Sequence, residues 1–183
     1  SSDLPGNDRA DLEHYQNAAK PLRLSVMGGP ELHGVRAGSG VHLGALKIHN
    51  HDHDLPALSD LVTVIKDAHD HDRPVAVHCV TRAELMLTLA ALEEAGSHSG
   101  DRIEHAAIAD EPALAWMVRL GLTIVTQPHF ITERAEAYQA EVEPFYRPHL
   151  WRPKTLPDAG LRRAAGVECP SGAHRRWAAK VSR

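Results

Sequence analysis

Short apolar segments rich in Val and Ile alternate with longer amphipathic segments along most of this chain of 183 residues. The apolar segments are bounded by Gly, Pro or Asp and predict buried strands at 22–27, 44–48, 74–79, 102–106, 122–126 and, more weakly, 163–168. Apolar side chains at helical spacing predict helices over 56–72, over a stripe at 85–92 that ends before Gly96, and over 111–120 and 133–146. Strands and helices in alternation indicate a parallel sheet with crossover helices, an α/β fold.

The spacing between the strand ends favours one kind of α/β fold, the TIM-type (β/α) barrel. Lys47 and His78 are 31 residues apart, His78 and His105 are 27 apart, and His105 and Glu168 are 63 apart. One βα unit takes roughly 30 residues and a complete barrel roughly 250. Residues 1–183 are therefore expected to form a single domain, an incomplete barrel. An open doubly wound sheet is the alternative, but the turn at 28–34 (GGPELHG) lacks the GxGxxG pattern typical of that fold.

Composition argues against several other classes of protein. The 20 Lys and Arg residues are outnumbered by 24 Asp and Glu and form no basic run, so a nucleic-acid partner is not expected. No segment approaches the ~18 consecutive apolar residues of a membrane span. Two cysteines, Cys79 and Cys169, are too few for a disulfide framework and favour a reducing compartment, the cytoplasm. The unusual count is 14 His, which directs the search for function to histidine.

Four residues with metal-site chemistry are expected at the ends of predicted strands. His78 ends the segment PVAVH, His105 ends RIEH, Lys47 lies near the end of GALKI, and Glu168 follows the weak last strand. Ligands collect at the carboxyl ends of parallel strands, so these side chains should converge on one mouth. Neutral imidazole suits Zn²⁺ and a carboxylate completes such sites, whereas a lysine contributes only if CO₂ converts it to a carbamate.

With these residues in place, the sequence resembles the amidohydrolase superfamily, in particular amidohydrolase family 3. The resembling segments are GALKIHNHDHDLP (44–56), RPVAVHCVTRAE (73–84), GDRIEHA (100–106), LGLTIVTQPHF (120–130) and, loosely, 156–172. The resemblance implies strands three to eight of the barrel, with Lys47, His78 and His105 as ligands on strands four, five and six. It implies one or two divalent metal ions, such as Zn²⁺, and hydrolysis of an amide or cyclic amide C–N bond in a small molecule. Glu168 would be the catalytic proton carrier.

Two departures from the family pattern lead to alternatives. The His-x-His pair of the family's first strand is missing from the sequence given. Glu168 stands where an Asp is usual, and its extra methylene group moves the carboxylate ~1.5 Å outward. Catalytic groups are commonly held within ~0.5 Å of their working position. We therefore expect weak or no hydrolase activity from this chain. One alternative is an inactive remnant or assembly subunit that at most binds a metal. Another is a metal-binding module of His49, His51 and His53, although a solvated loop is the interpretation favoured for those three residues.

Two further residues are candidates for binding substrate. His129 follows a predicted strand and could line the pocket. Arg82 could bind an anionic substrate group or pair with Glu84 on the surface, and the sequence does not separate these two roles. Cys79 points away from His78 in an extended strand and is expected in the core. Whether the chain forms a homo-oligomer is left open.

Overall fold

The computed structural model describes residues 2–17, 24–36, 38, 40–127, 142–150 and 160–165. Seven strands form one sheet in which every neighbouring pair is parallel and the spatial order equals the chain order. The strands are β1 (Ser2–Asn7), β2 (Leu24–Gly28), β3 (Val41–His49), β4 (Val75–Cys79), β5 (Arg102–His105), β6 (Thr123–Thr126) and β7 (Arg162–Ala165). The predicted α/β fold class is thus confirmed, and the sheet is open, as expected of an incomplete barrel.

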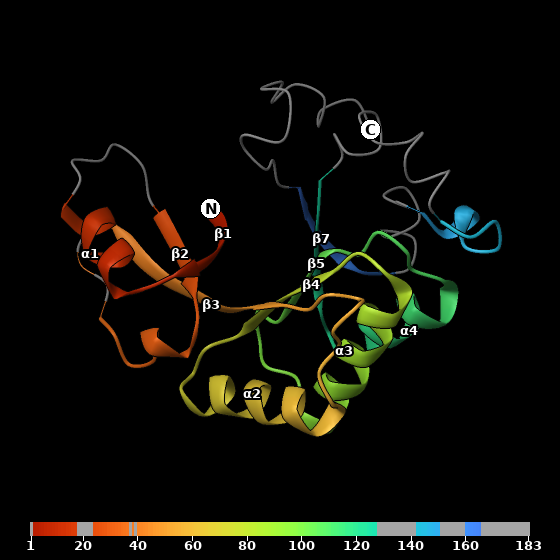
Figure 1. Ribbon diagram of the computed structural model, residues 1–183, viewed down its shortest axis with the longest axis horizontal. Helices are drawn as coiled ribbons and strands as arrows, with labels where there is room; N and C mark the ends of the chain where they lie inside the picture. The colour runs from red at the N-terminus through yellow and green to blue at the C-terminus, as the bar shows by residue number, and fades with distance from the viewer. Residues whose placement is uncertain are drawn as a thin grey trace.

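Helices connect successive strands of this sheet (Figure 1). They are α1 (Arg9–Asn17), α2 (Leu58–Asp70), α3 (Arg82–Ala95) and α4 (Glu111–Arg119), with short 3-10 turns η1 (Pro30–Leu32) and η2 (Arg147–His149). Three of the helices therefore occupy the ranges predicted from apolar spacing. Thr81 begins α3 with a capping box, because its hydroxyl accepts from the Glu84 backbone while the Glu84 carboxylate accepts from the Thr81 backbone. Within the described ranges, every helix is too short or too polar to cross a membrane.

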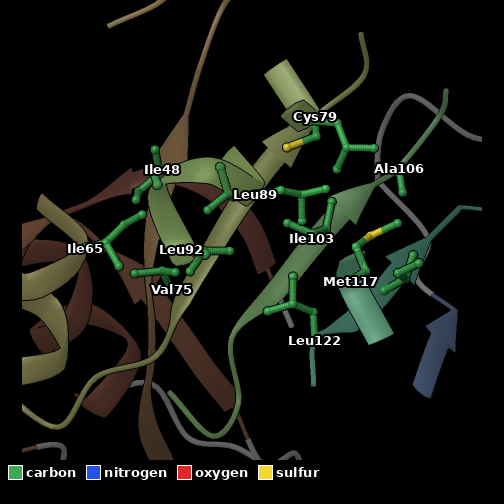
Figure 2. Close-up of a cluster of buried hydrophobic side chains, with 14 of the residues drawn as sticks. Ile48, Ile65, Val75, Cys79, Leu89, Leu92, Ile103, Ala106, Met117 and Leu122 are labelled. Carbon is green, nitrogen blue, oxygen red and sulfur yellow. The ribbon is translucent and has the colours of Figure 1, made fainter. Parts of the chain in front are cut away.

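The main hydrophobic core lies between the sheet and helices α2, α3 and α4. Ile65 from α2, Leu89 and Leu92 from α3, and Met117 from α4 all pack against strand residues such as Ile103 (Figure 2). Cys79 belongs to the same cluster, so the prediction that it lies in the core is confirmed. The apolar stripes that predicted the helices are the stripes that form this core.

A register shift in β3 determines which of its side chains face away from the helices. Val26 pairs with Leu43 but Gly28 pairs with Leu46, so β3 has one extra residue in this interval, the signature of a β-bulge. After the bulge, Leu46 and Ile48 pack into the core with the helices. Side chains alternate along a strand, so Lys47 and His49 lie on the other face, which we call the concave face.

Three sequence predictions need correction. Strand β1 was not predicted, because SDLPGN has no alternation of apolar residues; it lies at the edge of the sheet, where Pro is tolerated. The helix predicted over 133–146 is wrong for 142–146, which form a bend and a turn around Pro144; 133–141 lie outside the described residues. His49, predicted in a loop, is the last residue of β3.

Candidate metal centre at the strand ends

The carboxyl ends of three neighbouring strands bring together the basic side chains singled out from the sequence. His49 ends β3, His78 is the penultimate residue of β4, and His105 ends β5. His49 lies directly opposite His78 in the ladder, and Lys47 is two residues before His49 on the same face. Ala76, two residues before His78, packs with Ala45 and Met27 away from the helices, which places His78 on the concave face as well.

The imidazole rings of these strand ends contact one another in a row. The ring centroids of His49 and His78 are 4.2 Å apart and those of His78 and His105 are 4.5 Å apart, both in edge-to-face geometry. The row continues from His49 to His51 at 4.5 Å and from His51 to His53 at 5.4 Å. The structure thus brings His78 and His105 together, as expected, and adds His49 to them.

The ring of His78, between those of His49 and His105, is held in its neutral form. Burial, chiefly, lowers the pKa of His78 to about 3, and the nearby charges of His105, His49 and Lys47 act in the same direction. Burial also lowers the pKa of His49, with help from His51 and Lys47. Neutral imidazole is the form that binds Zn²⁺ and similar ions, so the donor chemistry of this row fits a divalent metal.

His105 has an unusual backbone conformation. Its φ is 71° and that of Ala106 is 48°, in the left-handed region that residues other than Gly rarely adopt. Its ladder partner Cys79 packs towards the helices, and a regular strand would direct His105 there too. The strand ends at His105 instead, and its ring lies against His78 while the residue is only 5% exposed. Such conformations cost about 1–3 kcal/mol each and cluster at functional sites.

An ion pair with one buried partner lies beside the histidines on the same face. Nε of Arg102 donates to Oε1 of Glu104 at 2.7 Å, and Glu104, which is fully buried, is the ladder partner of His78. Arg102 also contacts the sulfur of Met27. Sequence reasoning missed this pair, although the alternation in RIEH places Arg102 and Glu104 on one face and was the available signal.

Two amide side chains beside the site are buried without hydrogen-bond partners. Gln127 directly follows β6 and is 0% exposed, and neither amide atom makes a hydrogen bond in the described structure. Asn50 directly follows His49, and its Nδ2 atom is likewise buried without a hydrogen-bond partner in the described structure. An unsatisfied buried amide costs about 1–3 kcal/mol, so stability alone does not account for these two residues.

The other predicted site residues are not in the histidine row. Arg82 begins α3 and its Nε donates to Asp110 at 2.9 Å, so the surface pairing with Glu84, one of the two roles left open for it, is not formed. Glu84 is buried and accepts instead from the backbone of Val80 and Thr81. His129 and Glu168 lie outside the described residues, and their predicted roles stay predictions.

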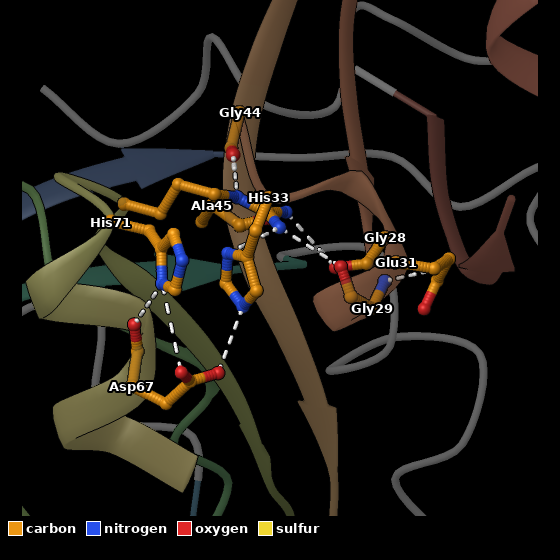
Figure 3. Close-up of polar contacts among 9 residues, drawn as sticks. Gly28, Gly29, Glu31, His33, Gly44, Ala45, Asp67 and His71 are labelled. Carbon is orange, nitrogen blue, oxygen red and sulfur yellow. Dashed lines mark hydrogen bonds and ion pairs between the residues drawn. The ribbon is translucent and has the colours of Figure 1, made fainter. Parts of the chain in front are cut away.

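A second group of histidine and carboxylate side chains lies at the end of α2, next to η1 (Figure 3). The ligand atoms of His33, Asp67 and His71 lie within 4.8 Å of one another, the only such group of His, Cys, Asp or Glu in the part of the chain that the structure describes. Arg73 donates from Nη1 to Nδ1 of His33 at 3.4 Å, and burial and this guanidinium lower the pKa of His33. The proton of neutral His33 therefore resides on Nε2, which faces Asp67 at 3.1 Å. Since a metal needs that lone pair, this geometry favours proton sharing over metal binding.

Comparison with known proteins identifies the fold. No family model matches the sequence, and no curated protein matches it. Among solved structures, a metal-dependent hydrolase from Pyrococcus furiosus matches with a TM-score of 0.77 at 20% identity, over 90% of this chain and 41% of that chain. One from Pyrococcus horikoshii matches with a TM-score of 0.68 at 19% identity, over 84% and 38%. An adenosine deaminase from Xanthomonas campestris with bound zinc matches with a TM-score of 0.52 at 19% identity, over 75% and 30%.

The chain therefore spans well under half the length of these proteins. In this chain, Lys47, His78 and His105 lie on three neighbouring parallel strands. These are also the segments on which the sequence resemblance rests. The fold of this chain is thus the one shared by these two metal-dependent hydrolases and the adenosine deaminase, as the sequence resemblance predicts.

Proposed function

We propose that this chain carries the central part of a metal-dependent hydrolase that cleaves a C–N bond, in an amide or cyclic amide, of a small molecule. The observation that carries the proposal is the contact of His78 with His105 at two adjacent strand ends, with the second ring held by a strained backbone. The similar structures support it, because two are named metal-dependent hydrolases and one is a deaminase with bound zinc.

His78 and His105 would hold the metal ion, with Zn²⁺ as the expected ion. Lys47 lies on the same face and would contribute an oxygen ligand as its carbamate, which would also remove a positive charge from beside His78. A bound divalent ion lowers the pKa of a water ligand from 15.7 to about 7 and polarises a carbonyl. The ion pair of the partly exposed Arg102 with the buried Glu104 lies beside these ligands on the concave face.

The remaining roles are assigned to residues around the metal ligands. Glu168 would carry the proton to the leaving nitrogen. Gln127, with no hydrogen-bond partner in the described structure, and His129 would face the substrate. Arg82 is held by Asp110, so binding an anionic substrate group requires it to exchange that partner. We expect the substrate to be a small molecule and the compartment to be the cytoplasm.

The competing proposal is a catalytically inactive relative that at most binds metal, alone or as an assembly subunit. The observation that favours it is that the ligand atoms at the strand ends do not converge, because among the described residues only His33, Asp67 and His71 have three such atoms within 4.8 Å of one another. We therefore expect the activity of this chain to be weak.

Turnover of a panel of small amides and cyclic amides, with added Zn²⁺ or Mn²⁺, tests both proposals. We expect slow, metal-dependent turnover that is lost in His78→Asn and His105→Asn and kept in His53→Asn, a matched histidine on the exposed turn after β3. Metal binding without turnover of any substrate would favour the inactive relative. Rapid turnover by the chain as given would contradict the expected impairment.

A further inference from the structure

His33 connects the turn after β2 with the end of α2, two segments that are far apart in the sequence (Figure 3). It directly follows η1, whereas Asp67 lies near the end of α2 and His71 caps that helix. Nε2 of His33 lies 3.1 Å from the Asp67 carboxylate, and its ring stacks on the ring of His71 with centroids 4.2 Å apart. Arg73, just before β4, contacts the other ring nitrogen of His33. We call these four residues the His33 cluster.

Arg73 leaves room for only one proton on the ring of His33. Nη1 of Arg73 donates to Nδ1 of His33 at 3.4 Å, so Nδ1 must offer a lone pair. A guanidinium carries donors and no acceptor, and it keeps its charge at every ordinary pH. A second proton, on Nδ1, would therefore set two donors and two positive charges against each other, and the contact of His33 with Arg73 would be lost.

The charges that face His33 act mainly against this second proton. Burial is the largest cause that lowers the pKa of His33, the charges of Arg73 and His71 act in the same direction, and Asp67 opposes them. Asp67 is half exposed and also lies 3.6 Å from Nδ1 of His71, so its charge is shared between two imidazoles. Glu31, on η1, favours the charged form of Arg73, to which β3 contributes backbone carbonyls.

We propose that the His33 cluster is an acid-sensitive switch, in which a second proton on His33 displaces Arg73 and loosens the junction of β2, β3 and β4. Arg73 donates to carbonyls of both β2 and β3, so a guanidinium driven away from His33 gives up contacts on two strands at once. The proposal does not depend on the proposed function, because Arg73 precedes β4 whereas His78 lies near the carboxyl end of that strand.

The direction of the pH effect follows from the lowered pKa of His33. The ordinary value of 6.5 applies to the unfolded chain, and the value in the folded chain is lower. Above pH 6.5 the ring is neutral in both states and does not affect the free energy of unfolding. As the pH falls below 6.5 the unfolded chain binds the proton first, so the free energy of unfolding decreases. Acid therefore weakens the junction, and neutral pH restores it.

His69 provides a matched control on the same helix. Its Nε2 lies 3.2 Å from the buried carboxylate of Asp101, and its ring stacks on that of His98 at 5.3 Å. The contacts of His69 in the described structure include no Arg or Lys, so a proton on its ring would strengthen the contact with Asp101 and break none. Replacing His69 thus removes an imidazole paired with a carboxylate and leaves the His33 cluster intact.

Urea unfolding of the full chain, followed by circular dichroism at pH 7.5 and at pH 5, compares the wild type with His33→Gln and His69→Gln. Glutamine at position 33 stays neutral and keeps a donor and an acceptor. On acidification we expect the equilibrium constant for unfolding to rise at least about threefold more in the wild type than in His33→Gln. The contribution of His78 cancels, because both proteins contain it. His69→Gln should keep the larger rise of the wild type.

Amide hydrogen exchange at Leu46 reports on the junction itself. The backbone N–H of Leu46 donates to the carbonyl of Pro74 at 2.8 Å, next to Arg73. After correction for the intrinsic exchange rate, its protection should fall on acidification at least about threefold more in the wild type than in His33→Gln.

Two results would overturn the inference. Equal rises of the unfolding constant in the wild type and His33→Gln would show that His33 does not carry the acid sensitivity. If the rises differ but Leu46 keeps equal protection in both proteins, His33 titrates without displacing Arg73. Should His33→Gln fail to fold, nuclear magnetic resonance titration of the wild-type His33 ring decides the question. A pKa at or above 6.5 overturns the inference, and a lower pKa with loss of Leu46 protection over the same pH range supports it.

Discussion

Arg73 is the residue whose removal should damage this fold most. It lies two residues before β4 and is only 4% exposed. Its guanidinium donates to the carbonyls of Gly29 at 2.9 Å, Gly28 at 3.1 Å, Ala45 at 3.2 Å and Gly44 at 3.4 Å (Figure 3). Leu46 pairs with both Gly28 and Val75, so β4 begins at the level where β2 ends. Arg73 lies at that step and donates to four carbonyls of β2, β3 and the turn after β2.

The expected cost follows from these bonds. A hydrogen bond from a charged donor contributes about 1.5–3 kcal/mol, and burial, which lowers the pKa of Arg73, offsets part of this. Arg73→Met keeps the apolar stem and leaves the carbonyls unsatisfied, so we expect the free energy of unfolding to fall by about 3–5 kcal/mol. Arg73→Lys keeps the charge but not the planar fork, and should lose about half as much.

Urea unfolding followed by far-ultraviolet circular dichroism measures both variants against the wild type. Many domains have a stability of only about 5–15 kcal/mol, so the Met variant should unfold at a much lower urea concentration. If Arg73→Met stays within about 1 kcal/mol of the wild type, the four bonds do not hold the step in the sheet. If Arg73→Lys is fully stable, the positive charge alone suffices and the fork geometry is irrelevant.

Three further predictions concern residues near the site. Burial raises the pKa of Cys79 to about 12, so in a Cys169→Ser background a thiol reagent at pH 8 should label the protein only after unfolding; rapid native labelling would contradict this. The pKa of His78 is about 3 in the folded chain and 6.5 in the unfolded chain. Between these two pH values only the unfolded chain binds the proton, so the free energy of unfolding is unaffected by His78 above pH 6.5 and decreases as the pH falls from 6.5 towards 3. When the pH is lowered from 6.5 to 5, the free energy of unfolding measured in urea should fall by about 1 kcal/mol more in the wild type than in His78→Asn, a figure that is discounted for the partial exposure of His78. Equal decreases in the two proteins would show that the pKa of His78 is not lowered. Gln127→Leu should raise the free energy of unfolding by about 1–2 kcal/mol, and with it the melting temperature, because an unsatisfied buried amide is removed. A lower melting temperature would show that Gln127 has a hydrogen-bond partner.

The fold was predictable where the signal is local. Helix α2 lies inside the predicted range because apolar residues at helical spacing, such as Leu61 and Ile65, are the residues that α2 buries. Strand β1 was not predictable in this way. It exists through pairing with β2 and through the Asn7 amide, which donates to the Met27 carbonyl at 2.8 Å, a contact across 20 residues of sequence.

Site residues could be predicted from the sequence only where the end of a strand could be predicted. His78 and His105 were found because both follow clear apolar segments, and parallel strands bring their ends together. His49 was assigned to a loop because the predicted strand ends at 48, whereas β3 extends to His49 and the bulge before Leu46 decides which face it occupies. The contact of Arg73 with His33 spans 40 residues and depends on tertiary structure alone, which no local pattern encodes.

Energetic costs are concentrated at the carboxyl ends of β5 and β6, and this favours a functional site there over a chain selected only to fold. The left-handed backbone at His105 and the unsatisfied amide of Gln127 each cost about 1–3 kcal/mol, and the concave face also buries the carboxylate of Glu104, paired with the partly exposed Arg102. A chain selected only to fold would lower all three costs with ordinary substitutions, such as Gly at 105 and Leu at 127. These costs lie at the carboxyl ends of β5 and β6, beside His78, whose pKa already keeps it neutral and able to bind a metal. If Gln127→Leu proves more stable than the wild type and yet binds Zn²⁺ equally well, the amide serves the substrate and not the fold or the metal.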